Sequence, residues 1–167
     1  SYPDYNYAEM ETFYVGARLD GEKDRVLIKF EGLISDGQVP QGSKIKSAKL
    51  ILTHCGTQGI NGGLTVNVRR VIEGWEEGTG KATIANAGEV TWDYRVYNTL
   101  KWSSDINKDG GNDGGCGYPQ SHSLDMEISK SYTANPEKGT KAEFDVTGIV
   151  QYWADNGEKS NYGFILI

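Results

Sequence analysis

The sequence has few of the residues on which metal and nucleophilic catalysis depend. Its 167 residues include two cysteines and two histidines, His54 and His122. No HExxH, GxSxG or paired CxxC pattern occurs, so the common zinc-hydrolase, serine-hydrolase and thioredoxin chemistries lack their parts. A small polysaccharide lyase, with Tyr97 as acid and Arg95 or His122 as neutraliser, is the remaining catalytic alternative. No pattern in the sequence singles those three residues out.

Long basic and long apolar runs are also missing. The net charge of -6 repels a phosphate backbone, and no run of Lys or Arg is interleaved with aromatic residues, which argues against a nucleic-acid partner. No apolar stretch approaches the roughly 18 residues of a membrane-spanning helix. The first residues, SYPDYNYAE, have neither the basic nor the apolar part of a signal peptide. We therefore expect no membrane span, and a module whose targeting sequence lies elsewhere.

Proline is scarce, with 4 residues, whereas glycine occurs 22 times and tyrosine 10 times. This composition suits a loop-rich β protein and not a disordered chain, because the apolar residues alternate with polar ones instead of being sparse. A chain of 167 residues is long enough for one core and short for two. We therefore expect a single domain over residues 1–167, and the acidic surface favours a monomer.

Period-two alternation of apolar and polar residues predicts the strands. It runs through residues 25–30, 48–53, 64–69, 124–129 and 142–146, and the terminal YGFILI predicts a last strand. The absence of alternating helices predicts an all-β fold, an antiparallel two-sheet β-sandwich of jelly-roll type with one short helix. The alternation directs five side chains inward: Phe30, Leu50, Val68, Phe144 and Phe164. It directs four to the opposite strand faces: Lys29, Lys49, Arg69 and Glu143.

The single predicted helix follows the strand at 142–146. Thr147 is expected to cap its first turn, and Asn156-Gly157 supplies a stop. Ile149, Val150 and Trp153 fall on one face. We expect this face to close one end of the core.

Five strings in order span most of the chain: FYVGARLDGEKDRVLIKFEGL, VPQGSKIKSAKLILT, VRRVIEGWEEG, VTWDY and FDVTGIVQYWADNGEKSNYGFILI. Together they resemble the DNRLRE domain, also met as the disaggregatase-related repeat and as the alginate-associated carbohydrate-binding module family. The segment DRVLIKF, residues 24–30, stands where that family has a similar charged and apolar run. We expect two departures from the family: an absent or altered first strand before Ser1, and a stretch over residues 94–123 that is longer and richer in glycine.

The resemblance implies a β-sandwich module attached to an extracellular polysaccharide-active enzyme or to a cell-surface protein. It implies polysaccharide binding without catalysis, which would raise the local substrate concentration for an appended catalytic domain. A structural or adhesive surface-protein domain that contacts other protein chains is the alternative from a different class.

The four tryptophans fall into two groups by position. Trp75, Trp92 and Trp153 stand beside strand and helix patterns, so we expect them in the core or at its edge. Trp102 lies in the glycine-rich insertion, where no core pattern requires a large ring, so a core position and a sugar-stacking platform both remain open for it. The predicted ligand-binding set combines rings with two cations for uronate or sulfate groups: Tyr94, Arg95, Tyr97, Lys101, Trp102 and Tyr118.

The same insertion suggests a structural calcium site. Asp105, Asn107 and Asp109 have the one-three-five spacing of oxygen ligands that begins a calcium loop. Asn112 and Asp113 would complete a looser site, because the twelfth position, where an EF-hand has glutamate, is a cysteine here. A polar, turn-rich loop that binds no metal is the alternative.

The sequence also leaves open whether Cys55 and Cys116 form a disulfide. In a secreted domain an even pair suggests a disulfide, which would close a loop of about 60 residues and constrain the unfolded chain by roughly 4 kcal/mol. Two free thiols are the alternative.

Overall fold

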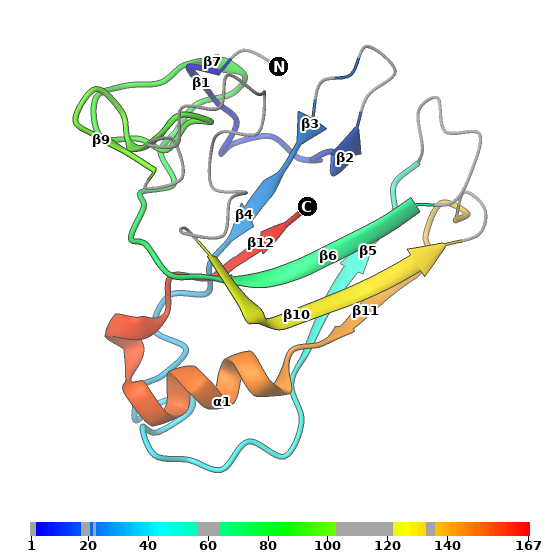
Figure 1. Cartoon of the computed structure of the whole chain (residues 1–167), viewed down its shortest axis with the longest axis vertical. Coiled ribbons are helices and arrows are strands. Elements are labelled where there is room, and N and C mark those ends of the chain that lie inside the picture. Colours follow the sequence, from blue (N-terminus) through cyan, green and yellow to red (C-terminus); the bar gives the residue numbers. More distant parts are fainter. Residues whose placement is uncertain (1–2, 18–20, 22, 57–63, 103–121, 133–135) are drawn as a thin grey trace.

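The computed structural model describes residues 3–17, 21, 23–56, 64–102, 122–132 and 136–167 (Figure 1). The regular secondary structure of this part is mostly strand, with one α-helix, which confirms the all-β class. The elements in order are β1 (Tyr5–Asn6), β2 (Gly16–Ala17), β3 (Lys23–Asp24), β4 (Val26–Ile28), β5 (Lys49–Thr53), β6 (Leu64–Val71), β7 (Thr83–Ile84), β8 (Tyr94–Val96), β9 (Leu100–Lys101), β10 (His122–Tyr132), β11 (Lys141–Asp145), α1 (Thr147–Asn156), the 3-10 turn η2 (Glu158–Ser160) and β12 (Phe164–Leu166).

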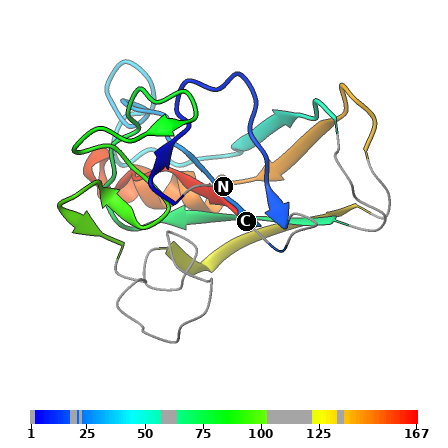
Figure 2. The same ribbon diagram turned by 90° about the horizontal axis from the view of Figure 1, so that it is seen from above.

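The largest sheet has four antiparallel strands in the order β10-β6-β12-β4. Strand β12, near the end of the chain, pairs with β4 on one side and with β6 on the other. A separate antiparallel pair joins β11 to β5, with Phe144 opposite Leu50. Seen from above, strands β5 and β11 lie apart from strands β6 and β10 (Figure 2).

The main core lies between the two-stranded sheet, one face of the four-stranded sheet and helix α1. Leu50 and Phe144 contribute from the smaller sheet, and Val68 and Phe164 from the larger one, each at most 5% exposed. Four of the five predicted inward positions are therefore confirmed. Burial of such side chains stabilises the fold by about 1.5–3 kcal/mol each.

Phe30, the fifth predicted inward residue, is 49% exposed, so that prediction is wrong. Alternation continues to Phe30 in the sequence, but β4 ends at Ile28. Beyond the strand nothing fixes the alternation of faces. The Phe30 ring instead meets the edge of Phe164, with ring centroids 6.4 Å apart.

Of the predicted outward residues, Lys49 and Glu143 are exposed and form an ion pair at 2.8 Å. Lys29 and Arg69 are half-buried. The reason is that the outer face of the large sheet is itself covered around β12. A side chain that points away from the main core is therefore still shielded from water.

The covering layer forms a second cluster of buried residues: Val71, Trp75, Trp102 and Ile165. Ile165 contributes from the middle of β12, and both tryptophans come from the segment between β6 and β10. Consequently all three residues of β12 are at most 2% exposed although they point to opposite faces.

Helix α1 closes one end of the main core as expected, with Ile149, Val150 and Trp153 buried. Thr147 does not cap the helix: the N-cap position is Val146, which makes no side-chain capping hydrogen bond. Thr147 is the first helical residue, and the Asp145 carboxylate accepts hydrogen bonds from its backbone N–H (3.0 Å) and hydroxyl (2.5 Å). These bonds lower the pKa of Asp145, the larger contribution coming from the hydroxyl. The helix ends at Asn156, where Gly157 has a positive φ of 82° and its N–H donates to the Trp153 carbonyl.

Each cluster contains one tryptophan with no exposed surface: Trp153 in the main core and Trp102 in the outer one. We expect Trp153→Ala and Trp102→Ala each to lower the free energy of unfolding by about 3–5 kcal/mol, because both leave a cavity. Urea denaturation followed by circular dichroism measures the change. Ile84→Ala, at a 63% exposed position, is the control and should stay within about 0.5 kcal/mol of the parent protein.

Candidate functional site

The described residues form an open groove of about 750 Å³. It lies between the N-terminal segment, strands β3 and β4, and the segments around Trp75 and Trp92; Ile165 also lines it. We call it the aromatic groove, because its lining includes six rings: Tyr5, Tyr7, Phe13, Tyr14, Trp75 and Trp92. Its volume falls within the range of small-ligand sites.

One wall of the groove presents aromatic side chains to solvent. Tyr7, Phe13 and Tyr14 are 42%, 48% and 53% exposed, and Met10 beside them is 40% exposed. Large rings left in water at one location cost free energy unless something covers them, so such clusters mark interaction sites. This wall is therefore available for a flat apolar ligand surface.

Another wall is the outer edge of strand β4, with which no strand of the described residues pairs. On β12 the residues of odd number bond to β6, as the paired 2.9 Å bonds between Ile167 and Asn67 demonstrate. Phe164 and Leu166 therefore bond to β4, and the backbone N–H and C=O of Leu27 point away from the sheet. The seven consecutive residues 23–29 all line the groove, so it follows this edge.

A buried amide holds the N-terminal wall in place. Asn6 is 2% exposed, and its Nδ2 donates to the carbonyls of Glu77 (2.7 Å) and Val90 (2.9 Å). Its Oδ1 accepts from the backbone N–H groups of Ala8 (3.1 Å) and Gly80 (2.8 Å). All four hydrogen-bonding positions of the amide are used. Three of these bonds fix the N-terminal segment to residues 71 to 84 positions further along the chain.

A buried carboxylate fixes the loop that receives Asn6. Glu89 is 8% exposed and accepts from the backbone and side chain of Asn86 (2.8 and 3.1 Å) and from the backbone and hydroxyl of Thr79 (2.9 and 3.1 Å). These bonds, led by the backbone N–H of Asn86, lower the pKa of Glu89 to about 2. Gly78 lies between the two anchors, with φ at 85°, and a Cβ there would approach the Glu89 side chain to 2.7 Å.

The groove also contains a stacked cation. The guanidinium carbon of Arg25 lies 4.6 Å from the ring centroid of Trp92, which is half-buried. Such stacking orients both groups and contributes about 0.5–2 kcal/mol. Trp92, expected at the edge of the core, thus presents part of its surface to the groove.

A smaller cavity of about 280 Å³ adjoins the groove, and Lys29, Trp75 and Glu76 line both. In it the Trp75 indole N–H donates to the Tyr162 carbonyl at 2.8 Å. Lys29 Nζ forms an ion pair with Oε1 of Glu31 at 3.0 Å. The cavity gives the groove a polar extension beyond β4.

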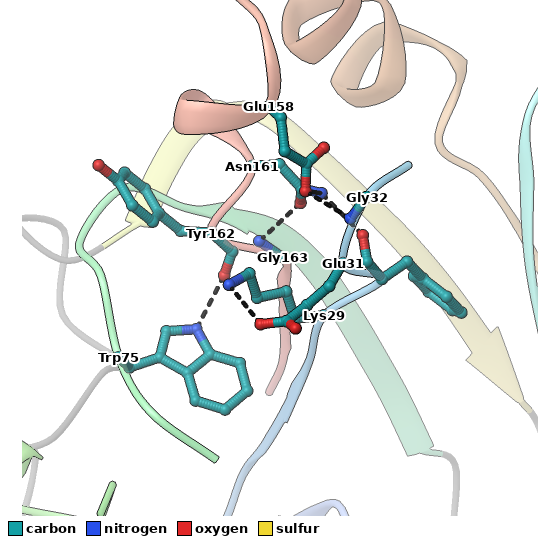
Figure 3. Close-up of polar contacts among 9 residues, drawn as sticks. Lys29, Glu31, Gly32, Trp75, Glu158, Asn161, Tyr162 and Gly163 are labelled. Atoms are coloured by element: carbon teal, nitrogen blue, oxygen red, sulfur yellow. Dashed lines mark hydrogen bonds and ion pairs between the residues drawn. The ribbon is translucent and has the colours of Figure 1, made fainter. Parts of the chain in front are cut away.

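The turn after β4 is fastened to the chain before β12. The Glu158 carboxylate accepts from the N–H groups of Gly32 and Ile34, both at 2.9 Å. Asn161 donates to the Phe30 carbonyl at 2.9 Å and accepts from the N–H of Gly163 (Figure 3). A Cβ at Gly163 would collide with the Ile28 carbonyl oxygen, so the two segments approach as closely as glycine allows.

Three of the predicted binding residues do come together, on the hairpin of β8 and β9. The rings of Tyr94 and Tyr97 meet edge to face with centroids 5.5 Å apart, and Lys101 Nζ lies 5.4 Å from the Tyr94 ring. Arg95 instead lines the smaller cavity, where it donates to the Gly74 carbonyl at 3.1 Å. Both tyrosines are half-buried.

Trp102 is not a surface platform. It has no exposed surface, it packs against Val71, Trp75 and Ile165, and its indole nitrogen donates to the Thr91 carbonyl at 3.2 Å. The physical reason is that β12 is apolar on both faces and needs a cover for Ile165. The continuous apolar run FILI is the sequence signal for such two-sided burial.

The remaining predicted ligands lie outside the described residues. These are Tyr118 and the proposed calcium set Asp105, Asn107, Asp109, Asn112 and Asp113. Within the described residues, no group of three or more His, Cys, Asp or Glu side chains is placed to hold a metal ion. Cys55 is an exposed free thiol, and Cys116 also lies outside the described ranges.

No helix in the described segments is long and apolar enough to cross a membrane.

Sequence reasoning missed the rings of the N-terminal wall. Tyr7, Phe13 and Tyr14 follow no strand or helix periodicity. The sequence feature that could have identified them is the density of aromatic residues near the N-terminus. The first fourteen residues, SYPDYNYAEMETFY, contain four tyrosines and a phenylalanine with no alternation that would bury them. Aromatic enrichment without a core pattern is a reason to expect exposure.

The low pKa of Glu89 makes the groove sensitive to acid. The folded pKa of about 2 lies below the ordinary 4.5, so Glu89 contributes stability that is present above pH 4.5 and is lost as pH falls toward 2. We expect Glu89→Gln to lower the melting temperature at pH 6, and the gap to the parent protein to narrow between pH 4.5 and 2. Melting curves of both proteins across this range measure the gap. A gap that stays constant would contradict the ionised-acceptor role.

The whole chain matches no protein-family model, no curated protein and no solved structure. The function proposed next therefore rests on the residues of the groove and on the sequence resemblance described above.

Proposed function

We propose that the protein is a non-catalytic carbohydrate-binding module of jelly-roll type, belonging to a larger extracellular or cell-surface protein, and that a polysaccharide lies in the aromatic groove. The observation that carries this proposal is the exposed wall of Tyr7, Phe13 and Tyr14 in one groove with the outer edge of β4. The resemblance to the alginate-associated module family supports the same class of ligand.

The chemistry of a sugar chain fits the two kinds of wall. A pyranose ring has an apolar face of C–H bonds, which an aromatic ring can cover, and a rim of hydroxyl groups. Tyr7, Phe13 and Tyr14 supply the ring surface. Each hydroxyl both donates and accepts, so it matches the outward N–H and C=O of Leu27 on the β4 wall.

Charged side chains line the groove with both signs. Lys23, Arg25 and Lys29 lie among Asp24, Glu31, Glu76 and Glu77. Carboxylates accept hydrogen bonds from sugar hydroxyls, and cations can pair with acidic substituents. The lining therefore supports contacts to neutral and to acidic polysaccharides, and the binding assay includes both.

The anchoring of the wall supports a preformed site. Asn6 and Glu89 together use eight hydrogen bonds to hold the N-terminal segment and its receiving loop. A wall that is ordered before binding loses less conformational entropy when the ligand arrives. Polysaccharide retention by such a module raises the substrate concentration at an appended enzyme without any bond being made or broken.

Phe13 and Phe30 provide a matched pair for the test. Both are phenylalanines with nearly equal exposure, 48% and 49%, but only Phe13 lines the groove. We expect Phe13→Ala or Tyr14→Ala to weaken binding by about threefold to tenfold, the loss that one stacked ring produces, with little change in melting temperature. Phe30→Ala should leave binding unchanged.

Affinity gel electrophoresis against alginate, pectin and neutral plant glucans measures the effect. Retention of the parent protein by none of these glycans would favour the structural or adhesive alternative. Equal weakening by Phe13→Ala and Phe30→Ala would place the ligand elsewhere on the surface. Release of unsaturated or reducing ends during incubation would indicate a lyase or hydrolase instead.

A further inference from the structure

Among the residues that the structure describes, strand β5 is paired along one edge only. The backbone N–H of Val146 donates to the Ala48 carbonyl at 3.0 Å, and that of His54 donates to the Thr140 carbonyl at 2.9 Å. Both bonds follow the same register as the pairing of Leu50 with Phe144. Residues of even number along this strand therefore direct their backbone groups to β11.

The residues of odd number direct theirs the other way. Lys49, Ile51 and Thr53 turn their N–H and C=O groups away from β11, and no described segment hydrogen-bonds to them. All three side chains are exposed, and Ile51 is 49% exposed. An apolar residue on an uncovered strand edge is the feature that proteins usually avoid, because such an edge recruits another strand.

The two sheets also differ in width. The larger sheet has four strands and the smaller has two, and β11 lies near β10 at one side. The open edge of β5 therefore faces the half of the larger sheet formed by β12 and β4. On this half Val26 and Ile28 of β4 are only half-buried, whereas Val68 of β6 and Leu166 of β12 are at most 1% exposed.

We propose that the open edge of β5 accepts an extended strand from a partner polypeptide. The added strand pairs with Lys49, Ile51 and Thr53 and becomes the third strand of the smaller sheet. Its alternate side chains extend the main core toward Val26 and Ile28. The partner is thus recognised by its backbone and by apolar residues at every second position.

A second copy pairing through its own β5 does not fit this edge. Paired strands lie about 4.8 Å apart, and each further strand of a sheet adds a similar distance. In both copies β12 and β4 extend past β5 beneath the open edge, so the two larger sheets would occupy the same space. A single extended segment has no sheet beneath it and avoids this overlap.

The first test measures amide hydrogen exchange by NMR. In the protein alone, the amides of Ile51 and Thr53 should exchange much faster than those of Leu50 and Leu52, which bond to β11. The probe is a capped peptide of alternating valine and threonine about as long as β5. Its addition should slow exchange at Ile51 and Thr53 by about tenfold, the change that one hydrogen bond can produce. The same peptide N-methylated at alternate positions is the control and should have no effect.

The second test uses proline at neighbouring positions. Ile51→Pro removes an N–H to which no described residue offers an acceptor, so the variant should fold and lose the response to the peptide. Leu52→Pro removes an N–H that bonds to β11, so it should lose most of its stability. If Ile51→Pro is destabilised as much as Leu52→Pro, or if the Ile51 amide is already protected without peptide, the edge is occupied by the chain itself and the proposal fails. It also fails if the peptide slows no amide of β5.

Discussion

The burial of strand β12 on both faces is the constraint on which the rest of the structure depends. Phe164 and Leu166 belong to the main core, whereas Ile165 between them belongs to the outer cluster. Helix α1 and the smaller sheet cover Phe164 and Leu166. Trp75 and Trp102 cover Ile165, so their segment must cross the outer face of the larger sheet. That crossing places Trp92 and the loop of Glu89 beside β4, and Asn6 attaches the N-terminal segment to the same loop.

The aromatic groove is therefore a consequence of how a sheet is covered. Trp75 belongs to the outer cluster and lines the groove, so one residue links the packing of β12 to the shape of the site. The anchoring groups are fully used within the protein: the Asn6 amide makes four hydrogen bonds and the Glu89 carboxylate accepts four. The rings of Tyr7, Phe13 and Tyr14, in contrast, remain exposed to solvent. This separation between groups that build the wall and groups that remain exposed is what a preformed binding surface requires.

The sequence predicted the strands well and the candidate site poorly, and the reasons are physical. Leu50, Val68 and Phe144 alternate with polar neighbours, so their period-two pattern identifies the strand and the buried face together. Whether Trp102 is buried depends on whether its segment covers the outer side of β12. Periodicity carries no information on that. The groove joins residues 5–14 to residues 75–92, and such long-range contacts between irregular segments have no periodic signature in either segment.

The pairing of β4 with β12 joins residues 26–28 to residues 164–166, nearly the full length of the chain. Closing so long a loop costs conformational entropy, which the contacts made around β4 and β12 must offset. Both walls of the groove depend on it: one is β4 itself, and the other is attached through the segment that covers Ile165. A chain that has folded only its smaller sheet and helix thus has no groove. Ligand binding then reports on completion of the whole fold, and a ligand held there stabilises every strand at once by mass action.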